Sequence, residues 1–392
     1  MGITKRGHLG KLGATGVAVG ALALGVGMMA PGFGAVAAGA QPGPGGRAGQ
    51  GPAGQGPGGQ GVHGQGHHLN HVFVIMLENH SRSSVIGDRG PNGKLTMPYL
   101  THLAHTYGMA THYYGVTHPS EPNYIAATSG STWDVNNDSP SNRYDHRNIV
   151  DELAAHHLTW DAYMQAIPSA GYGGAQYPPA PSTGSDTNAL YVAKHDPFML
   201  YTDVRSNPAR RSHVKPYSAL AGDLNSGRAP NYVWISPDTC DDLHGGVYSH
   251  VAGRPDTPCP YNATNDDKYD VALKHKADAF VKGAVTTIMD SKAWTGNSAI
   301  WIVADEGSYS ATNGATGHEA SVAGCCDSPV LPAGDPDISK AWPGGVYGGG
   351  LVPAVVVSRN GPRHAVDNTP YNHYSMLLTI EEGLGLGRLG YT

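Results

Sequence analysis

The stretch HVFVIMLEN, residues 71–79, decides the fold, because six consecutive apolar residues run directly into Glu78 and Asn79. A continuous apolar run of this length predicts a strand buried on both faces, as in parallel sheets. The same pattern recurs far along the chain, where an apolar run ends in Asp305 and Glu306. Open α/β sheets bind ligands just beyond the carboxyl ends of their strands. The pairs Glu78–Asn79 and Asp305–Glu306, called the acidic pairs below, are therefore expected to meet at one edge of a sheet.

Strand-like and helix-like segments alternate along the chain. Strands are expected at 71–77, 109–114, 158–164, 231–235, 298–304 and 352–357. Helices are expected at 97–107, 122–130, 148–157, 218–225, 270–289 and 371–382. The segment 168–190 is expected to be a loop. This alternation predicts an α/β fold with a mostly parallel central sheet flanked by helices.

Residues 1–68 differ in composition from the rest of the chain. Residues 1–40 combine basic residues, a small-residue apolar stretch and A-x-A cleavage motifs, which together predict a secretory signal peptide. A membrane anchor is the alternative, although Pro31 interrupts the apolar stretch. Residues 41–68 are almost all Gly, Gln, Pro and Ala, which predicts a disordered linker. One folded domain is expected at 69–392, and none of its apolar runs is long enough to span a membrane.

The net charge of −6 argues against one class of partner. The first 40 residues hold three basic residues and no acidic one, so the charge without them is −9. An acidic exported protein is a poor general binder of nucleic acid. The 21 histidines leave room for a pH-dependent site. The sequence does not decide the oligomeric state.

The four cysteines agree with export, because an even cysteine count in a secreted chain predicts disulfides. Three pairings are open. A bond between Cys240 and Cys259 is favoured, and it would tie down the loop that carries His244. A bond between the vicinal Cys325 and Cys326 is strained but allowed.

Ser120 lies at a loop-to-helix junction between Pro119 and Glu121, and Pro122 is expected to open the helix. Free N–H groups at a helix start favour a serine alkoxide, or the phosphate that the serine attacks. A simple helix cap is equally compatible with this position. Asn123, just inside the helix, could donate its amide to a phosphate oxygen.

The two acidic pairs supply hard oxygen donors, which favours one divalent cation held by Glu78, Asn79, Asp305 and Glu306. Calcium, magnesium or manganese is favoured, and zinc is the weaker alternative. A single glutamate at a strand end is more often a residue that simply leaves the core. Two such ends that converge on one point are harder to explain in that way.

Four histidines are candidates for the site. His195 lies in KHDPF, His244 follows two aspartates, His373 lies in YNHYS, and His118 stands two positions before Ser120. Taken singly, each is more often a surface or hydrogen-bonded histidine than a catalytic one.

Six segments carry a resemblance to a known family, and they occur in the order VIMLENHS, THPSEPNYIAATSG, KHDPF, SPDTCDDLHGG, ADEG and TPYNHYSMLLTIEEGLGL. They resemble the phosphoesterase family of secreted acid phosphatases and bacterial phospholipases C, in the alkaline phosphatase superfamily. The similarity runs from about residue 70 to about residue 389. It implies an alkaline-phosphatase-like α/β/α sandwich and metal-dependent hydrolysis of phosphate esters.

The resemblance implies a role for the residues that match the family's nucleophile and metal ligands. Ser120 matches the serine that is transiently phosphorylated. Glu78 and Asn79 match the first pair of metal ligands. Asp305 and Glu306 match the second pair.

The resemblance also places residues around the substrate. Asn123 matches a residue near the bound phosphate. His118 and His373 are further candidates to bind that phosphate, although His373, which matches the family's YNHYS pattern, also fits a structural role. His195 and His244 match histidines that contact phosphate or protonate the leaving group. His244 is the first choice for the acid and His195 the second.

The chain departs from the family pattern at two positions. Ala304 stands where many members have Trp or Phe before the acidic pair. Leu351 stands where many members have the histidine of a His-Val-Pro segment, so one expected phosphate-binding histidine is absent. His318 and His364 are the candidates to replace it.

These observations predict a secreted, metal-dependent hydrolase that cleaves phosphate monoesters through a phosphoserine, as expected of an acid phosphatase. The substrate is expected to be a small phosphorylated molecule or a phosphorylated lipid headgroup. A phospholipase C-type phosphodiesterase is the first alternative. A catalytically inactive secreted binding protein is the second.

Overall fold

The computed structural model describes residues 69–179, 188–251, 254, 256–260, 268–308, 323–326 and 346–392. All of them belong to one unit that spans residues 62–392. The expected signal peptide and linker lie outside the described residues.

Eight strands of the described chain form a central sheet in the order β12-β2-β11-β9-β1-β8-β4-β7. Their bounds are β1 (His71–Leu77), β2 (Gly108–Tyr114), β4 (Trp160–Met164), β7 (Val214–Pro216), β8 (Tyr232–Ser236), β9 (Ser298–Ala304), β11 (Ala354–Ser358) and β12 (Ala365–Asn372). Neighbouring strands are parallel except at β11, which runs antiparallel to β2 and β9. The prediction of a mostly parallel sheet is confirmed.

Two small ladders lie outside the central sheet. They pair β3 (Thr117–His118) with β10 (Val346–Tyr347), and β5 (Gln176–Tyr177) with β6 (Tyr191–Val192). The first of these ladders leads directly into the helix that begins at Ser120.

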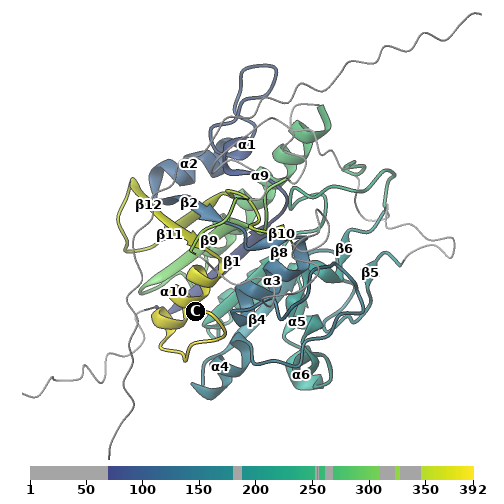
Figure 1. The fold of residues 1–392 in the computed structure, drawn as a ribbon, viewed down its shortest axis with the longest axis vertical. Helices are drawn as coiled ribbons and strands as arrows, with labels where there is room; N and C mark the ends of the chain where they lie inside the picture. The colour runs from purple at the N-terminus through teal and green to yellow at the C-terminus, as the bar shows by residue number, and fades with distance from the viewer. Residues whose placement is uncertain are drawn as a thin grey trace, which may run out of the picture. The chain divides into compact units, whose positions relative to one another are not determined.

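Helices flank the central sheet. The longer ones are α2 (Pro98–Thr106), α3 (Ser120–Ser129), α4 (Ile149–Ala155), α8 (Leu220–Asn225), α9 (Lys268–Met289) and α10 (His373–Leu384). Single turns form α1 (Arg82–Val85), α5 (Pro197–Leu200), α6 (Thr202–Arg205), α7 (Pro208–Arg211) and the 3₁₀ turns η1 (Ala193–His195) and η2 (Tyr217–Ala219). Helix α2 packs on α9 and α3 packs on α10, and these pairs cover the two sides of the sheet (Figure 1).

The core is centred on the adjacent strands β9, β1 and β8. Every residue of β8 and β9 is buried, as is every residue of β1 after His71. Burial of apolar surface stabilises a fold by roughly 25 cal/mol per Å², so these continuous apolar strands fix the centre of the sheet. Their carboxyl ends are consequently held firmly side by side.

The structure adds several short elements to those predicted, among them β7 of the central sheet, and three further differences have a physical reason. Helix α3 begins at Ser120 rather than Pro122, because the first N–H groups of a helix need no intrahelical acceptor and a proline fits the third position. The expected loop 168–190 contains the short strand β5. Strand β12 was not predicted, because its sequence AVDNTPYN lacks an apolar pattern. It is a largely exposed edge strand, where Pro370 is tolerated.

No helix of the described ranges is both long and apolar enough to cross a membrane. The structure forms the expected disulfide between Cys240 and Cys259, whose Cα atoms lie 5.5 Å apart. Cys325 and Cys326 are also bonded to each other, which the sequence had left open.

Candidate active site

The strand ends of β1 and β9 bring the two acidic pairs together. Leu77 and Ala304 are partners in the parallel register, so Glu78 and Asp305 come next to each other at the carboxyl edge. The Asp305 N–H donates to the Leu77 carbonyl at 2.9 Å, and the Asn79 N–H donates to Asp305 Oδ1 at 3.2 Å. The expected convergence of the strand ends is present.

Ser120 points into this acidic edge from the start of α3. Its Oγ donates to Glu78 Oε2 at 3.1 Å and lies 3.4 Å from Glu306 Oε1. Its side chain is buried, with the residue only 1 % exposed. A buried hydroxyl between two carboxylates has a proton acceptor on each side, which suits a nucleophile that must lose its proton.

Asn123 and His118 hold the loop that carries Ser120. The Asn123 amide donates to the carbonyls of Thr117 at 2.9 Å and Pro119 at 3.1 Å, and its oxygen accepts the Thr117 N–H at 3.1 Å. His118 Nδ1 lies 2.8 Å from Glu306 Oε2. These contacts fix the serine loop against the acidic edge, and they use the Asn123 groups expected to face phosphate.

His195 lies between two carboxylates. Its Nε2 is 2.9 Å from Glu78 Oε1, its Nδ1 is 3.1 Å from Asp242 Oδ2, and its ring stacks on Tyr124. Burial would lower the pKa of His195, but the charges of Glu78 and Asp242 raise it to about 9. Burial would raise the pKa of Glu78, and the His195 charge holds that pKa below its usual range. The pair is therefore an imidazolium with a carboxylate.

His244 has a different environment. Its Nδ1 donates to the Gly245 carbonyl at 2.8 Å, and its Nε2 accepts from Lys194 Nζ at 3.2 Å. Burial and the nearby Lys194 charge lower the pKa of His244 to about 3. The His195 and His244 rings meet edge to face, with centroids 5.2 Å apart. One histidine of this pair is thus charged and the other neutral.

The acidic edge has an excess of buried negative charge that a cation would balance. Burial, with the charges of Glu78 and Glu306, raises the pKa of Asp305 well above its usual range. Asp305 Oδ2 is buried and has no hydrogen-bond partner among the described residues. Oxygen donors without partners fit a divalent cation.

A second donor set adjoins this edge. Glu78, His195 and His244 each offer one ligand atom, and these atoms lie within 4.8 Å of one another. The two sets share Glu78, so a cation at the acidic edge would lie beside both histidines.

His373 contacts the backbone of the acidic edge. Its Nε2 donates to the Asp305 carbonyl at 2.5 Å, and its Nδ1 accepts from the Tyr113 hydroxyl at 3.0 Å. Both His373 nitrogens thus form hydrogen bonds within the protein, which fits a structural role for this residue. His364 bonds to the His105 carbonyl at the surface, and His318 lies outside the described residues.

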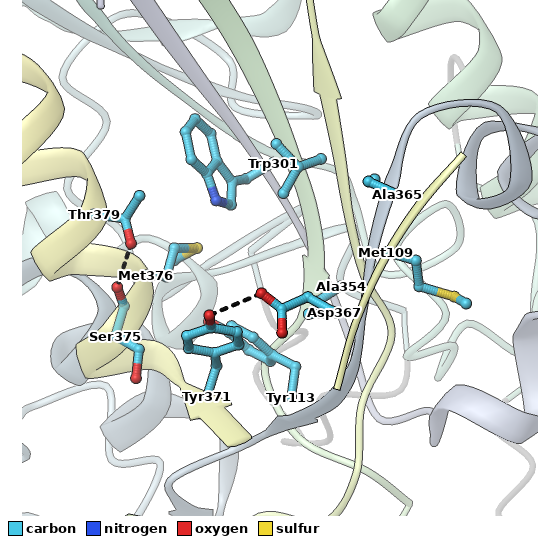
Figure 2. Close-up of a pocket in the computed structure, with 13 residues that line it drawn as sticks. Met109, Tyr113, Trp301, Ala354, Ala365, Asp367, Tyr371, Ser375, Met376 and Thr379 are labelled. Carbon is cyan, nitrogen blue, oxygen red and sulfur yellow. Dashed lines mark hydrogen bonds between the residues drawn. The ribbon is translucent and has the colours of Figure 1, made fainter. Parts of the chain in front are cut away.

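A cavity of about 290 Å³ lies between α10 and strands β2, β9, β11 and β12. Tyr113, Trp301 and Met376 line it, together with Tyr371, whose hydroxyl donates to Asp367 (Figure 2). This cavity contains none of the acidic pairs, Ser120 or the paired histidines. It is therefore not the catalytic centre.

Three residues of the site were missed by sequence reasoning. Asp242 pairs with His195, and Lys194 contacts both His244 and Asp138. Lys194 precedes His195 in the KHDPF segment, so that segment was the available signal. Asp138 lies in a loop of small polar residues, and nothing in the sequence distinguishes it.

Comparisons with known proteins show what this chain is similar to. The family model described as "Phosphoesterase family" matches residues 92–387. An acid phosphatase of Aspergillus fumigatus is 30% identical over 179 residues, which cover 45% of this chain and 36% of the relative. A phosphate-repressible acid phosphatase of Penicillium chrysogenum is 32% identical over 149 residues, covering 37% and 34%. A phosphatidylinositol-3-phosphatase of Mycobacterium tuberculosis is 28% identical over 177 residues, covering 45% and 52%.

Each alignment thus spans about a third to a half of the relative's length. Among solved structures, the periplasmic domain of EcEptC from Escherichia coli, in complex with Zn, overlaps with a TM-score of 0.45 at 13% identity, covering 83% of this chain and 85% of that one. A protein in the alkaline phosphatase superfamily from Vibrio parahaemolyticus gives a TM-score of 0.42 at 12% identity, covering 81% and 67%. Both TM-scores are below 0.5, so the assignment depends on the sequence match. On that match, which extends over most of the chain, the protein belongs to the Phosphoesterase family, as its motifs predicted.

Proposed function

We propose that this protein hydrolyses phosphate monoesters through a phosphorylated Ser120. The observation that carries the proposal is the Ser120 hydroxyl, which is buried between Glu78 Oε2 and Glu306 Oε1. Family membership supports a phosphoric ester as the substrate, and relatives named acid phosphatase support a monoester. The signal-like residues 1–40 support secretion.

The first half of the reaction is an in-line displacement at phosphorus. Glu78 or Glu306 accepts the Ser120 proton, the Oγ–P bond forms, and the bond between phosphorus and the ester oxygen breaks. Asn123 and His118 keep the serine loop in place during attack. Positioning of this kind lowers the barrier because little motion is needed to reach the reactive geometry.

The departing alcohol oxygen needs a proton, and His195 and His244 are the candidates to supply it. His195 carries protons on both nitrogens, since each nitrogen faces a carboxylate. His244 accepts from Lys194 at Nε2, so it would have to release that contact before acting as the acid. The contacts therefore favour His195 over His244, the reverse of the order expected from the sequence. Water then attacks the phosphoserine and gives one proton to the histidine that lost its own. The bond between phosphorus and the Ser120 oxygen breaks, and that oxygen takes back the proton held by the glutamate.

The residues that would hold a divalent cation are Glu78, Asn79, Asp305 and Glu306. When bound, the cation would neutralise negative charge on the serine oxygen and on the phosphate. The oxygen-rich donor set favours calcium, magnesium or manganese. Zinc stays the weaker alternative, because His195 could bind it only after losing a proton and His244 only after releasing Lys194.

The test of the proposal is Ser120→Ala, measured with p-nitrophenyl phosphate. Loss of a catalytic nucleophile typically lowers turnover by about a thousandfold or more, and we expect a loss on that scale with unchanged folding by circular dichroism. Ser206→Ala, at an exposed position, is the matched control. Near-normal turnover in Ser120→Ala would reject the proposal. Preferred cleavage of bis-p-nitrophenyl phosphate by the wild type would favour the phospholipase C-type alternative.

A further inference from the structure

A second cavity, of about 220 Å³, adjoins the candidate active site. Asp138, Gln176 and Lys194 form its polar side, and small apolar residues such as Ala175 and Val192 form the rest. The cavity has room for several waters. That space suits a small organic group.

Two residues of this cavity also contact the catalytic centre. Lys194 Nζ donates to His244 Nε2 at 3.2 Å. Asp138 Oδ1 accepts the N–H of Glu121, the residue after Ser120, at 2.9 Å. The cavity therefore adjoins both the serine loop and the histidine pair, so the alcohol part of a phosphate ester bound at Ser120 could reach it.

The charges of the cavity compensate each other. Lys194 Nζ and Asp138 Oδ2 form an ion pair of 2.9 Å, and their side chains keep 19% and 26% exposure. A second anionic group would meet Asp138 as well as Lys194 and would gain little. Neutral hydroxyl groups can both donate to Asp138 and accept from Lys194, and the Gln176 amide can do either.

We propose that this cavity binds the alcohol part of the substrate and selects alcohols that carry several hydroxyl groups, such as the sugar of a sugar phosphate. The inference rests on the proposed phosphomonoesterase function. It adds a substrate class to that function. An apolar substrate would leave the hydrogen-bonding groups of the cavity unpaired, which opposes its binding.

The experiment compares glucose 6-phosphate with n-hexyl phosphate by phosphate release. Both are esters of primary alcohols, so their intrinsic reactivities are similar and the ratio of their kcat/KM values reports the cavity. We expect the wild type to prefer glucose 6-phosphate about tenfold or more. A ratio of one or below would overturn the inference. p-Nitrophenyl phosphate is the control for the chemistry, and failure to cleave it would reject the proposed function itself.

Two variants test whether this cavity is the source of the preference. Ala175→Trp fills the cavity from an exposed position, and Gln176→Leu removes its amide. Each should lower the glucose 6-phosphate preference about tenfold. Ala221→Trp, on the exposed side of α8, should leave it unchanged. An unchanged preference in both cavity variants would also overturn the inference, whereas p-nitrophenyl phosphate turnover would still support the proposed function.

Discussion

At the scale of single residues, the main feature of the site is the burial of three carboxyl groups close together. Glu78, Asp305 and Glu306 are all buried within one edge of the sheet. His195 compensates Glu78, and His118 compensates Glu306. Among the described residues, the donors to the Asp305 carboxylate are two backbone N–H groups, those of Asn79 and Glu306. It is therefore the residue whose charge most requires a cation.

The first prediction at this scale is a loss of bound metal. Asp305→Asn keeps the shape and one oxygen but removes the charge, so metal content by elemental analysis should fall to about half or less. Glu78→Gln should behave similarly. Asp145→Asn, at an exposed position, should keep full metal content.

A stability measurement provides a readout that does not depend on activity. Without metal, Asp305→Asn should be at least as stable to heat as the wild type, because burial and the charges of Glu78 and Glu306 disfavour the charged form of Asp305, which the amide cannot adopt. With metal, the wild type should gain more stability than the variant. Full metal content in both site variants would contradict this account.

At the scale of elements, loops rather than strands complete the site. The loop after β8 carries Asp242 and His244, and it is closed by the Cys240–Cys259 bond. The Val247 and Cys259 backbones also pair across this loop. A closed loop of 19 residues loses less entropy on ordering than an open one, so the bond should keep the histidine pair together.

The element-scale prediction is that the double variant Cys240→Ala/Cys259→Ala loses activity while its central sheet stays folded. We expect about a tenfold loss of kcat/KM and faster amide hydrogen exchange within residues 240–259. Exchange in β1 should change much less. Cys325→Ala/Cys326→Ala is the matched control and should retain its kcat/KM. Equal acceleration in β1 and in the loop would show that the bond stabilises the whole fold instead.

Sequence patterns predicted the elements that form the centre of the sheet. Strands β1, β8 and β9 are continuous apolar runs, and only burial on both faces accounts for such runs. Strand β12 could not be found in this way, since its register depends on the edge of β2 and not on its own sequence. The start of α3 was misplaced because a proline is equally acceptable at the first and third helical positions.

The part of the site that lies at the ends of these strands could be predicted as well. Residues that directly follow buried strands, such as Glu78 and Asp305, are placed by the sheet itself. Lys194 and Asp138 come from separate loops, so their contact follows only from the tertiary fold. For the same reason, the sequence did not show that both His373 nitrogens bond within the protein.

At the scale of the whole molecule, buried carboxyl groups favour the fold in mild acid. Burial raises the pKa of Glu381 from an ordinary 4.5 to about 7, and it raises that of Glu121 similarly. Between these pH values the two glutamates bind more protons in the folded chain than in the unfolded chain. Their contribution to the free energy of unfolding therefore decreases as the pH rises through this window.

This linkage predicts that Glu381→Gln lowers the Tm at about pH 5 relative to the Tm at about pH 7.5, by roughly 2 °C or more compared with the wild type. The variant keeps an acceptor for the Leu389 N–H without a titrating group. Comparison with the wild type removes the opposite contribution of His244 and His373, whose lowered pKa values favour the fold as the pH rises. Glu382→Gln, at the exposed ion pair with Arg388, is the control and should keep the wild-type difference. An unchanged difference in Glu381→Gln would contradict this account.

The central claim is that Ser120 carries the phosphoryl group, and the stereochemical course at phosphorus tests it most directly. A chiral, oxygen-isotope-labelled phosphorothioate ester would be hydrolysed in labelled water, and the configuration of the released thiophosphate determined. Each in-line displacement inverts the phosphorus, so attack by Ser120 followed by attack of water predicts overall retention. Overall inversion would mean that water attacks the substrate directly, and it would contradict the account.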